Sequence, residues 1–216
     1  MADHVVVGYV HPGTVRAEFM ASMLGLVRRG SPPVDQVIEI GSGPNVSGAR
    51  NLMTRMFLAE QSAPWLFMVD TDMVFAPDAL DRLVASADPA ERPIVGALCY
   101  SQDGATGDPQ PVMYELVERD GQPSFARYGS WPEDACVRVA ATGAACLLMH
   151  RDALERVRSF GGDLAAPWFR ESMIGTELVG EDLTFCLRAG AAGIPVHVNT
   201  GVEFGHVKHV TLGKVT

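Results

Sequence analysis

Lysine is almost missing from this sequence. Its 216 residues hold 17 lysines and arginines against 26 aspartates and glutamates, and the lysines are limited to Lys208 and Lys214. A formal net charge of −9 does not favour the basic surface that binds phosphate backbones. We therefore expect no nucleic-acid partner, and an anionic small substrate would need a metal ion or local arginines.

Long apolar runs and paired cysteines are missing as well. No stretch approaches the roughly 20 apolar residues that span a bilayer, and the run 5–7 is too short for a signal peptide and lacks a basic leader. The four cysteines are dispersed without a C-x-x-C pair: Cys99, Cys136, Cys146 and Cys186. In a chain this large, such spacing predicts reduced thiols. We expect a cytoplasmic protein without a membrane span.

The first half alternates strand and helix patterns. The apolar runs predict strands over 4–10, 34–40, 65–69 and 94–100. The helices between them are expected from Thr14, as the N-cap, to Gly30, then through 50–58 and 77–86. This alternation predicts a single α/β domain with a mainly parallel sheet flanked by helices.

The second half has a different character. Segments 101–111 and 118–132 are rich in Gly, Pro, Asp and Ser, and they surround a predicted added strand over 112–117. A strand region over 136–151, a short helix over 152–157, a flexible stretch from 167 to 180 and a helix from Glu181 to about Gly190 complete the chain. We interpret the segment 101–132 as a variable excursion and not as a second domain.

Asp70-Thr71-Asp72 follows the apolar run Trp65–Val69, so a buried strand would deliver two carboxylates to a sheet edge. Ligands of open α/β sheets collect just beyond the carboxyl ends of the strands. Two hard oxygen donors suit Mg²⁺ or Mn²⁺ carrying a substrate diphosphate. The alternative is structural, because aspartates after strands also form turns and cap helices.

Six motifs occur in an order that resembles a known family. They are Ala49-Arg50-Asn51, Val69-Asp70-Thr71-Asp72, Thr142-Gly143, Pro167-Trp168-Phe169, Gly180-Glu181-Asp182 and Gly205-His206. Together they resemble the nucleotide-sugar glycosyltransferases of GT-A fold, especially the family-2-like group, over residues 1 to 207. The resemblance implies a single Rossmann-like domain over 1–216 with a mixed, mainly parallel sheet. Residues 1–100 would form its nucleotide-binding half and 101–216 its acceptor-side half.

The resemblance also implies roles for single residues. Asp70, Asp72 and His206 match the positions that hold Mn²⁺ or Mg²⁺ against the donor's diphosphate. Asp182, preceded by Glu181, matches the catalytic base of inverting members. The positions expected near the nucleotide are Val10, His11, Arg50, Thr71 and the two aspartates. The chain departs from the family at Tyr9-Val10-His11-Pro12, which leaves the donor base and sugar open.

The implied reaction is metal-dependent transfer of a hexose from a UDP- or GDP-sugar to a hydroxyl of a glycan, protein or small molecule. We expect inversion, and retention is the alternative, because some retaining enzymes of this fold also have an Asp-any-Asp motif and a later histidine. A sugar-nucleotide nucleotidyltransferase is an alternative, although no glycine-rich basic loop follows the first predicted strand. A catalytically inactive module of the same fold is another. The complete set Asp70, Asp72, Asp182 and His206 argues against it.

Each assignment has a structural alternative. Glu181 and Asp182 would also cap a helix, whose dipole favours their ionised form and would keep a base unprotonated at pH 7. Arg50 would either pair with a surface carboxylate or approach the nucleotide. Trp168 would be a core residue or, together with Gly143, part of the acceptor site, because sugars stack on aromatic rings.

Overall fold

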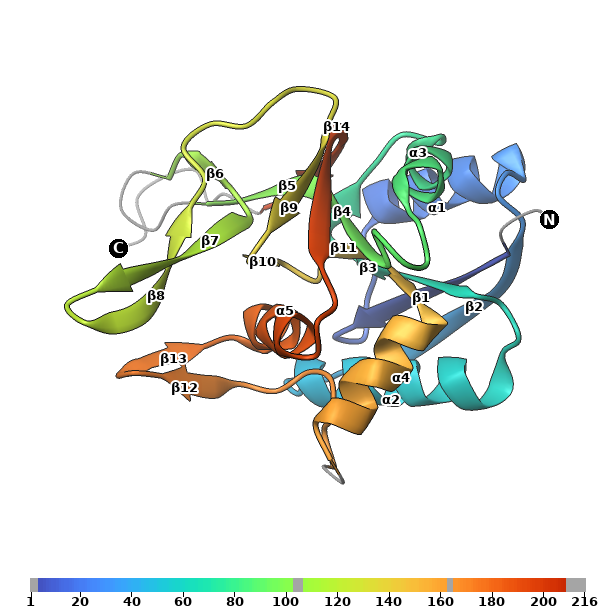
Figure 1. Ribbon diagram of the computed structural model, residues 1–216. Helices are drawn as coiled ribbons and strands as arrows, with labels where there is room; N and C mark the ends of the chain where they lie inside the picture. The colour runs from blue at the N-terminus through green and yellow to red at the C-terminus, as the bar shows by residue number, and fades with distance from the viewer. Residues whose placement is uncertain (1–3, 103–106, 163–164, 209–216) are drawn as a thin grey trace, which may run out of the picture.

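The computed structural model describes residues 4–102, 107–162 and 165–208, and a mixed sheet of nine strands runs through them (Figure 1). The order across the sheet is β2 (Val34–Gly41), β1 (Val5–His11), β3 (Trp65–Asp70), β11 (Cys146–His150), β5 (Ile94–Gln102), β14 (Val196–His206) and β4 (Met73–Val74). In addition, β6 (Pro109–Pro111) pairs with β5 and β9 (Cys136–Val139) pairs with β14. Both predicted halves of the chain therefore share one sheet.

The strands that carry the site run parallel to one another. β1 is parallel to both β2 and β3, and β5 is parallel to β14. β11 lies antiparallel between β3 and β5 and joins these two groups. The predicted mainly parallel sheet with helices is confirmed, and β11 makes it a mixed one.

Two layers of helices cover the sheet. α1 (Ala17–Arg29) and α3 (Ala79–Ser86) lie on one face, and α2 (Val46–Glu60), α4 (Arg151–Phe160) and α5 (Glu181–Ala191) lie on the other (Figure 1). Successive strand residues serve opposite layers, as the period of two requires. Val5 and Val7 pack with the α1 side, whereas Val6 and Val10 pack with the α2 side. The apolar runs of these strands therefore reflect the burial of both faces of the sheet.

Gly8 shows how closely α2 approaches β1. A Cβ atom at this position would lie 2.3 Å from the Met53 sulfur atom of α2. With any larger residue at position 8, the Met53 side chain would have to move. Gly8 therefore lets a side chain of α2 pack directly on the backbone of β1.

The second half of the chain also forms two small antiparallel units outside the main sheet. β7 (Met113–Arg119) pairs with β8 (Gln122–Arg127) and with β10 (Ala141–Thr142), so the predicted added strand is confirmed and belongs to a hairpin. The stretch expected to be flexible forms a second hairpin of β12 (Ser172–Ile174) and β13 (Glu177–Val179). Residues 103–106 of the predicted excursion lie outside the described residues.

Several helix boundaries differ from the prediction. α1 begins at Ala17 with Arg16 as its N-cap, so the expectation of a Thr14 cap was wrong; Gly13, at φ 115°, still belongs to the preceding turn. Gly30 ends α1 in the left-handed conformation, as predicted. α4 begins one residue earlier than expected, where the His150 ring accepts a hydrogen bond from the Asp152 backbone N–H and caps its start, and it continues to Phe160.

All four cysteines are free thiols, and only Cys136 is partly exposed. Burial raises the pKa of Cys136, and it raises the pKa of Cys186 to about 12. Both effects slow attack by thiol reagents, since the thiolate is the reactive form. Within the described residues, no helix is long and apolar enough to cross a membrane.

We therefore expect Cys136 to react first with a thiol reagent in the native protein, and all four cysteines to react in denaturant without prior reduction. Mass spectrometry of the labelled protein measures both stages. Cys136→Ser is the matched control and should remove the early phase. If only two thiols react in denaturant, a disulfide is present and the expectation of reduced cysteines is wrong.

Candidate functional site

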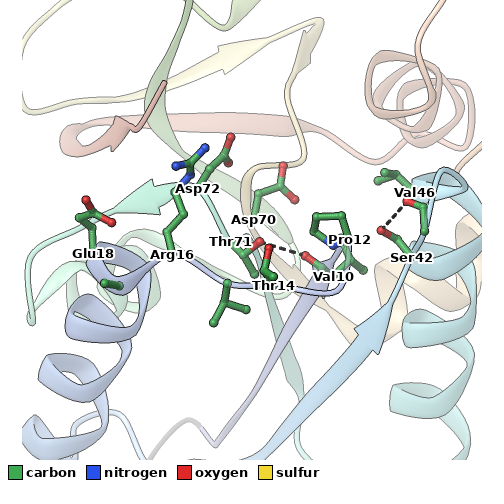
Figure 2. A pocket seen from close by; sticks show the side chains of 13 residues that line it. Val10, Pro12, Thr14, Arg16, Glu18, Ser42, Val46, Asp70, Thr71 and Asp72 are labelled. Carbon is green, nitrogen blue, oxygen red and sulfur yellow. Dashed lines mark hydrogen bonds between the residues drawn. The ribbon is translucent and has the colours of Figure 1, made fainter. Parts of the chain in front are cut away.

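The predicted site residues gather at the carboxyl ends of the parallel strands. β1 ends at His11 and β3 at Asp70, and Thr71 and Asp72 form the turn into β4. A cavity of about 620 Å³ opens there (Figure 2). Its lining comes from residues 10–72: Val10, Pro12, Thr14, Val15, Arg16, Ala17, Glu18, Ser42, Gly43, Val46, Asp70, Thr71 and Asp72.

Of the positions expected near a nucleotide, Val10 and Thr71 line this cavity and His11 does not. The Thr71 hydroxyl donates to the Val10 carbonyl at 3.5 Å, which ties the turn after β3 to the end of β1. The His11 ring lies 3.0 Å from Glu39 and accepts the Gly13 backbone N–H. His11 therefore shapes the turn after β1.

Asp72 and His206 are brought together by the pairing of β4 with β14. In that pairing His206 lies opposite Met73, and the Val207 N–H donates to the Asp72 carbonyl at 2.8 Å. The His206 Nε2 atom lies 2.8 Å from Asp72 Oδ2, and Nδ1 lies 2.8 Å from the Tyr100 carbonyl. Because a carbonyl only accepts, Nδ1 carries a proton, and in the neutral ring Nε2 presents a lone pair to the carboxylate.

Two acceptors that face each other require a cation or a proton between them. In the structure, the hydrogen bond to Asp72 raises the pKa of His206. Burial acts to raise the pKa of Asp72, but the hydrogen bonds and charges of His206 and Lys208 outweigh it and lower this pKa to about 2. An oxygen and a nitrogen donor, with a carbonyl behind the imidazole, also fit Mn²⁺ or Mg²⁺.

Asp70 is not part of that pair. Its carboxylate accepts hydrogen bonds from Arg50 Nη2 at 2.8 and 3.0 Å. Among the residues that the structure describes, no group of three or more His, Cys, Asp or Glu side chains is arranged to hold a metal. The structure thus joins two of the three predicted ligands, Asp72 and His206, and holds Asp70 by an arginine.

Arg50 connects the two ends of the site. It is only 4% exposed on α2, and its Nη1 atom donates to Glu181 Oε1 at 2.5 Å while Nη2 holds Asp70. Burial acts to lower the pKa of Arg50, but the charges of the neighbouring carboxylates outweigh it and raise this pKa. Arg50 pairs with carboxylates, as one alternative expected, but these are residues of the candidate site and not of the open surface.

Asn51, next to Arg50 on α2, holds the segment of Trp168 and Phe169 in place. Asn51 is buried; its amide donates to the Phe169 carbonyl and its oxygen accepts the Trp168 and Phe169 backbone N–H groups. Phe169 stacks on Phe185 of α5 with ring centroids 4.7 Å apart. These contacts hold α5 against α2. Trp168 is 1% exposed and its indole N–H donates to Leu154, so the acceptor-platform assignment is wrong and the core alternative holds.

Asp182 lies in the first turn of α5, beside a second cavity of about 380 Å³. Its Oδ1 atom accepts the Leu183 backbone N–H at 2.8 Å. Burial raises the pKa of Asp182 above 3.8 despite this bond and the nearby Arg50 charge. Desolvation of the carboxylate is thus the largest effect on this pKa, and it acts against the stabilisation of the ionised form that a helix N-terminus provides.

The second cavity extends from Asp182 to His206. Its lining includes Gly143 together with Arg50, Asp70, Tyr100, Tyr114, Arg127, Asp182 and His206. A Cβ atom at Gly143 would lie 3.5 Å from Asp182 Oδ2 and 3.0 Å from a Val112 methyl group. The absence of a side chain at Gly143 thus leaves this side of the Asp182 carboxylate open.

The sequence analysis missed several residues at these cavities. Arg16 extends from the start of α1 toward Asp72 (Figure 2). Tyr114 and Arg127 reach the second cavity from the β7–β8 hairpin, and the Arg127 guanidinium lies 4.9 Å from the Tyr114 ring centre. Lys208 Nζ lies 3.2 Å from Asp72 Oδ2. Of these residues, only Lys208 could have been found from the sequence, because it is one of two lysines and follows His206 by two positions.

No protein-family model and no curated protein sequence matches this chain. Solved structures that are similar to it include the following two. The protein A197 from STIV has a TM-score of 0.62 and 14% identity, over 95% of this chain and 86% of that chain. GalNAc-T7, solved with UDP, GalNAc and Mn²⁺, has a TM-score of 0.65 and 12% identity, over 98% of this chain and 45% of that chain.

At these identities the likeness shows the fold alone. The chain has a mixed α/β, Rossmann-like GT-A fold, as the sequence predicted. It spans less than half the length of GalNAc-T7.

The buried contacts of Arg50 predict a stability effect. Arg50→Met leaves Asp70 and Glu181 without their partner, and we expect the free energy of unfolding to fall by about 1–3 kcal/mol, less than for a fully buried pair because both carboxylates are partly exposed. Denaturant unfolding measures the change. Arg55→Met, on the same helix and hydrogen-bonded to the Ala165 carbonyl, should change stability by less than about 0.5 kcal/mol. Equal losses in the two variants would contradict the role of Arg50.

Proposed function

We propose that this protein is a metal-dependent, inverting glycosyltransferase that moves a sugar from a nucleoside-diphosphate donor to a hydroxyl acceptor. The observation that carries the proposal is the position of Asp70, which lines both cavities. On one side of it lie Asp72 and the larger cavity, and on the other lies Asp182. A donor and an acceptor would meet at this carboxylate.

The larger cavity is the proposed donor site. Its lining comes entirely from residues 10–72, so the first half of the chain would contact the nucleotide. Asp72 and His206 would hold Mn²⁺ or Mg²⁺. When bound, the ion would offset the negative charge that develops on the departing diphosphate. Arg50 keeps the Asp70 carboxylate oriented beside this site through its two hydrogen bonds.

Asp182 is the proposed base. The acceptor hydroxyl must lose a proton as it attacks, and a carboxylate of raised pKa takes up that proton more readily. Glu181 is the weaker candidate because Arg50 already occupies its carboxylate at 2.5 Å. The open side of Asp182 at Gly143 would admit the acceptor. Attack from the second cavity, opposite the departing diphosphate, would invert the anomeric centre.

The first test of this function is binding. Calorimetric titration with UDP and GDP should show affinity for at least one of them with Mn²⁺ and little with EDTA. Asp72→Asn should weaken Mn²⁺-assisted binding by roughly tenfold to a hundredfold, because it removes a ligand charge. Asp134→Asn, at an exposed aspartate, is the matched control and should bind as the wild type does. Equal affinity with and without EDTA would contradict the metal role.

The second test separates chemistry from binding. Asp182→Asn removes the proton acceptor and nearly preserves shape, so donor affinity should stay within about twofold while turnover falls by roughly 10² to 10⁴. Asp70→Asn should reduce both. Hydrolysis of the sugar nucleotide with release of nucleoside diphosphate reports turnover before the acceptor is known. Full turnover in Asp182→Asn with a true acceptor would overturn the base assignment, and pyrophosphate-dependent chemistry would indicate a nucleotidyltransferase.

The raised pKa of Asp182 also sets a pH dependence. The base acts only when it is deprotonated, so kcat should fall as the pH drops through a value above the ordinary 3.8 of aspartate. A pH profile of kcat measures this limb. An acidic limb at or below 3.8, in a protein shown to stay folded, would contradict the assignment.

A further inference from the structure

Lys208 contacts the same oxygen of Asp72 that His206 contacts. Its Nζ atom lies 3.2 Å from Asp72 Oδ2, and His206 Nε2 lies 2.8 Å from that oxygen. An ammonium group carries three donors and no lone pair, so it cannot be a metal ligand. Lys208 therefore holds, with a single charge, a carboxylate that the proposed function gives to a divalent cation.

The backbone keeps Lys208 at this place. The Val207 N–H donates to the Asp72 carbonyl at 2.8 Å, which ties the residue before Lys208 to the turn after β3. The lysine side chain itself is 45% exposed and lies over a small cavity that it shares with His206 and Tyr100. Its flexible stem can therefore release the carboxylate while its Cα atom stays near Asp72.

We propose that Lys208 is a donor-binding residue that works by exchange: its ammonium neutralises Asp72 in the empty site, gives way to the divalent cation, and then contacts the diphosphate that this cation carries. The inference rests on the proposed function, since it needs a cation and a diphosphate at Asp72. It adds a residue that none of the sequence motifs contains.

The charges around Asp72 explain why such an exchange is useful. Asp70 is already neutralised by Arg50, whereas the Asp72 carboxylate contacts the His206 ring and the Lys208 ammonium, and Arg16 extends toward it (Figure 2). A divalent cation brings one positive charge more than the ammonium that it displaces. The released ammonium then stays within reach of the same turn, where the charge of a diphosphate would be bound.

The exchange makes two predictions of opposite sign. In Lys208→Met, which keeps the apolar stem and removes the charge, Mn²⁺ should bind the nucleotide-free protein roughly twofold to fivefold more tightly, because its competitor is gone. At saturating Mn²⁺, UDP or GDP should bind roughly threefold to tenfold more weakly, because a charged contact to phosphate is lost. Calorimetry, or the electron paramagnetic resonance signal of free Mn²⁺, measures the first, and calorimetry the second.

Two control variants make the result specific. Arg28→Met, in the last turn of α1, removes one positive charge at an exposed position and should change neither affinity. Lys208→Arg keeps the charge and should restore most of both properties. Denaturant unfolding should give equal midpoints for Lys208→Met and the wild type, since the side chain is largely exposed.

Failure of this inference is distinguishable from failure of the proposed function. If the wild type binds Mn²⁺ and then the nucleotide, but Lys208→Met changes neither affinity, the cation does not displace Lys208 and the exchange is wrong. If both affinities rise, Lys208 only competes and does not contact the diphosphate, which also overturns the proposal. If neither protein binds Mn²⁺ or nucleotide, the proposed function itself fails.

Discussion

The buried guanidinium of Arg50 is the interaction on which the site depends. It lies between Asp70 at the end of β3 and Glu181 at the start of α5, two residues that are far apart in the sequence. A buried cation of this kind is tolerable only with its charge compensated on both sides. The same contact therefore fixes the orientation of one donor-side carboxylate and the position of the helix that carries Asp182. Asn51, one residue along α2, supports it by holding the segment that packs under α5.

Backbone pairing between β4 and β14 brings Asp72 and His206 together. β4 follows Asp72 directly and pairs with the last residues of β14, so His206 and Asp72 meet although 134 positions separate them. The two aspartates of the Asp-Thr-Asp motif consequently have different partners. Asp70 has an arginine, and Asp72 has a histidine and a lysine. In the function that we propose, this asymmetry gives the carboxylates different tasks: Asp72 would hold the cation, and Asp70, which lines both cavities, would stand between donor and acceptor.

The sequence analysis predicted the layers well because they depend on local patterns. Apolar runs such as Trp65–Val69 indicate strands buried on both faces, and the helices between them predict a mainly parallel sheet. Predictions about single side chains were less reliable. Trp168 is held in the core by the contact of its backbone with Asn51, and the pKa of Asp182 is raised mainly by burial. Asn51 is 117 positions from Trp168, and the burial of Asp182 comes from the packing of the whole fold.

The sequence by itself determined the alternation of strands and helices and the carboxylates and histidine that stand at the ends of these elements, since hydrophobic period and residue type are local properties. Only the tertiary structure decided which of them meet. It placed Arg50 between Asp70 and Glu181, joined His206 and Lys208 to Asp72, and opened a cavity on each side of Asp70. Distances, burial and pKa shifts arise from contacts between segments far apart in the chain, and no local pattern encodes them.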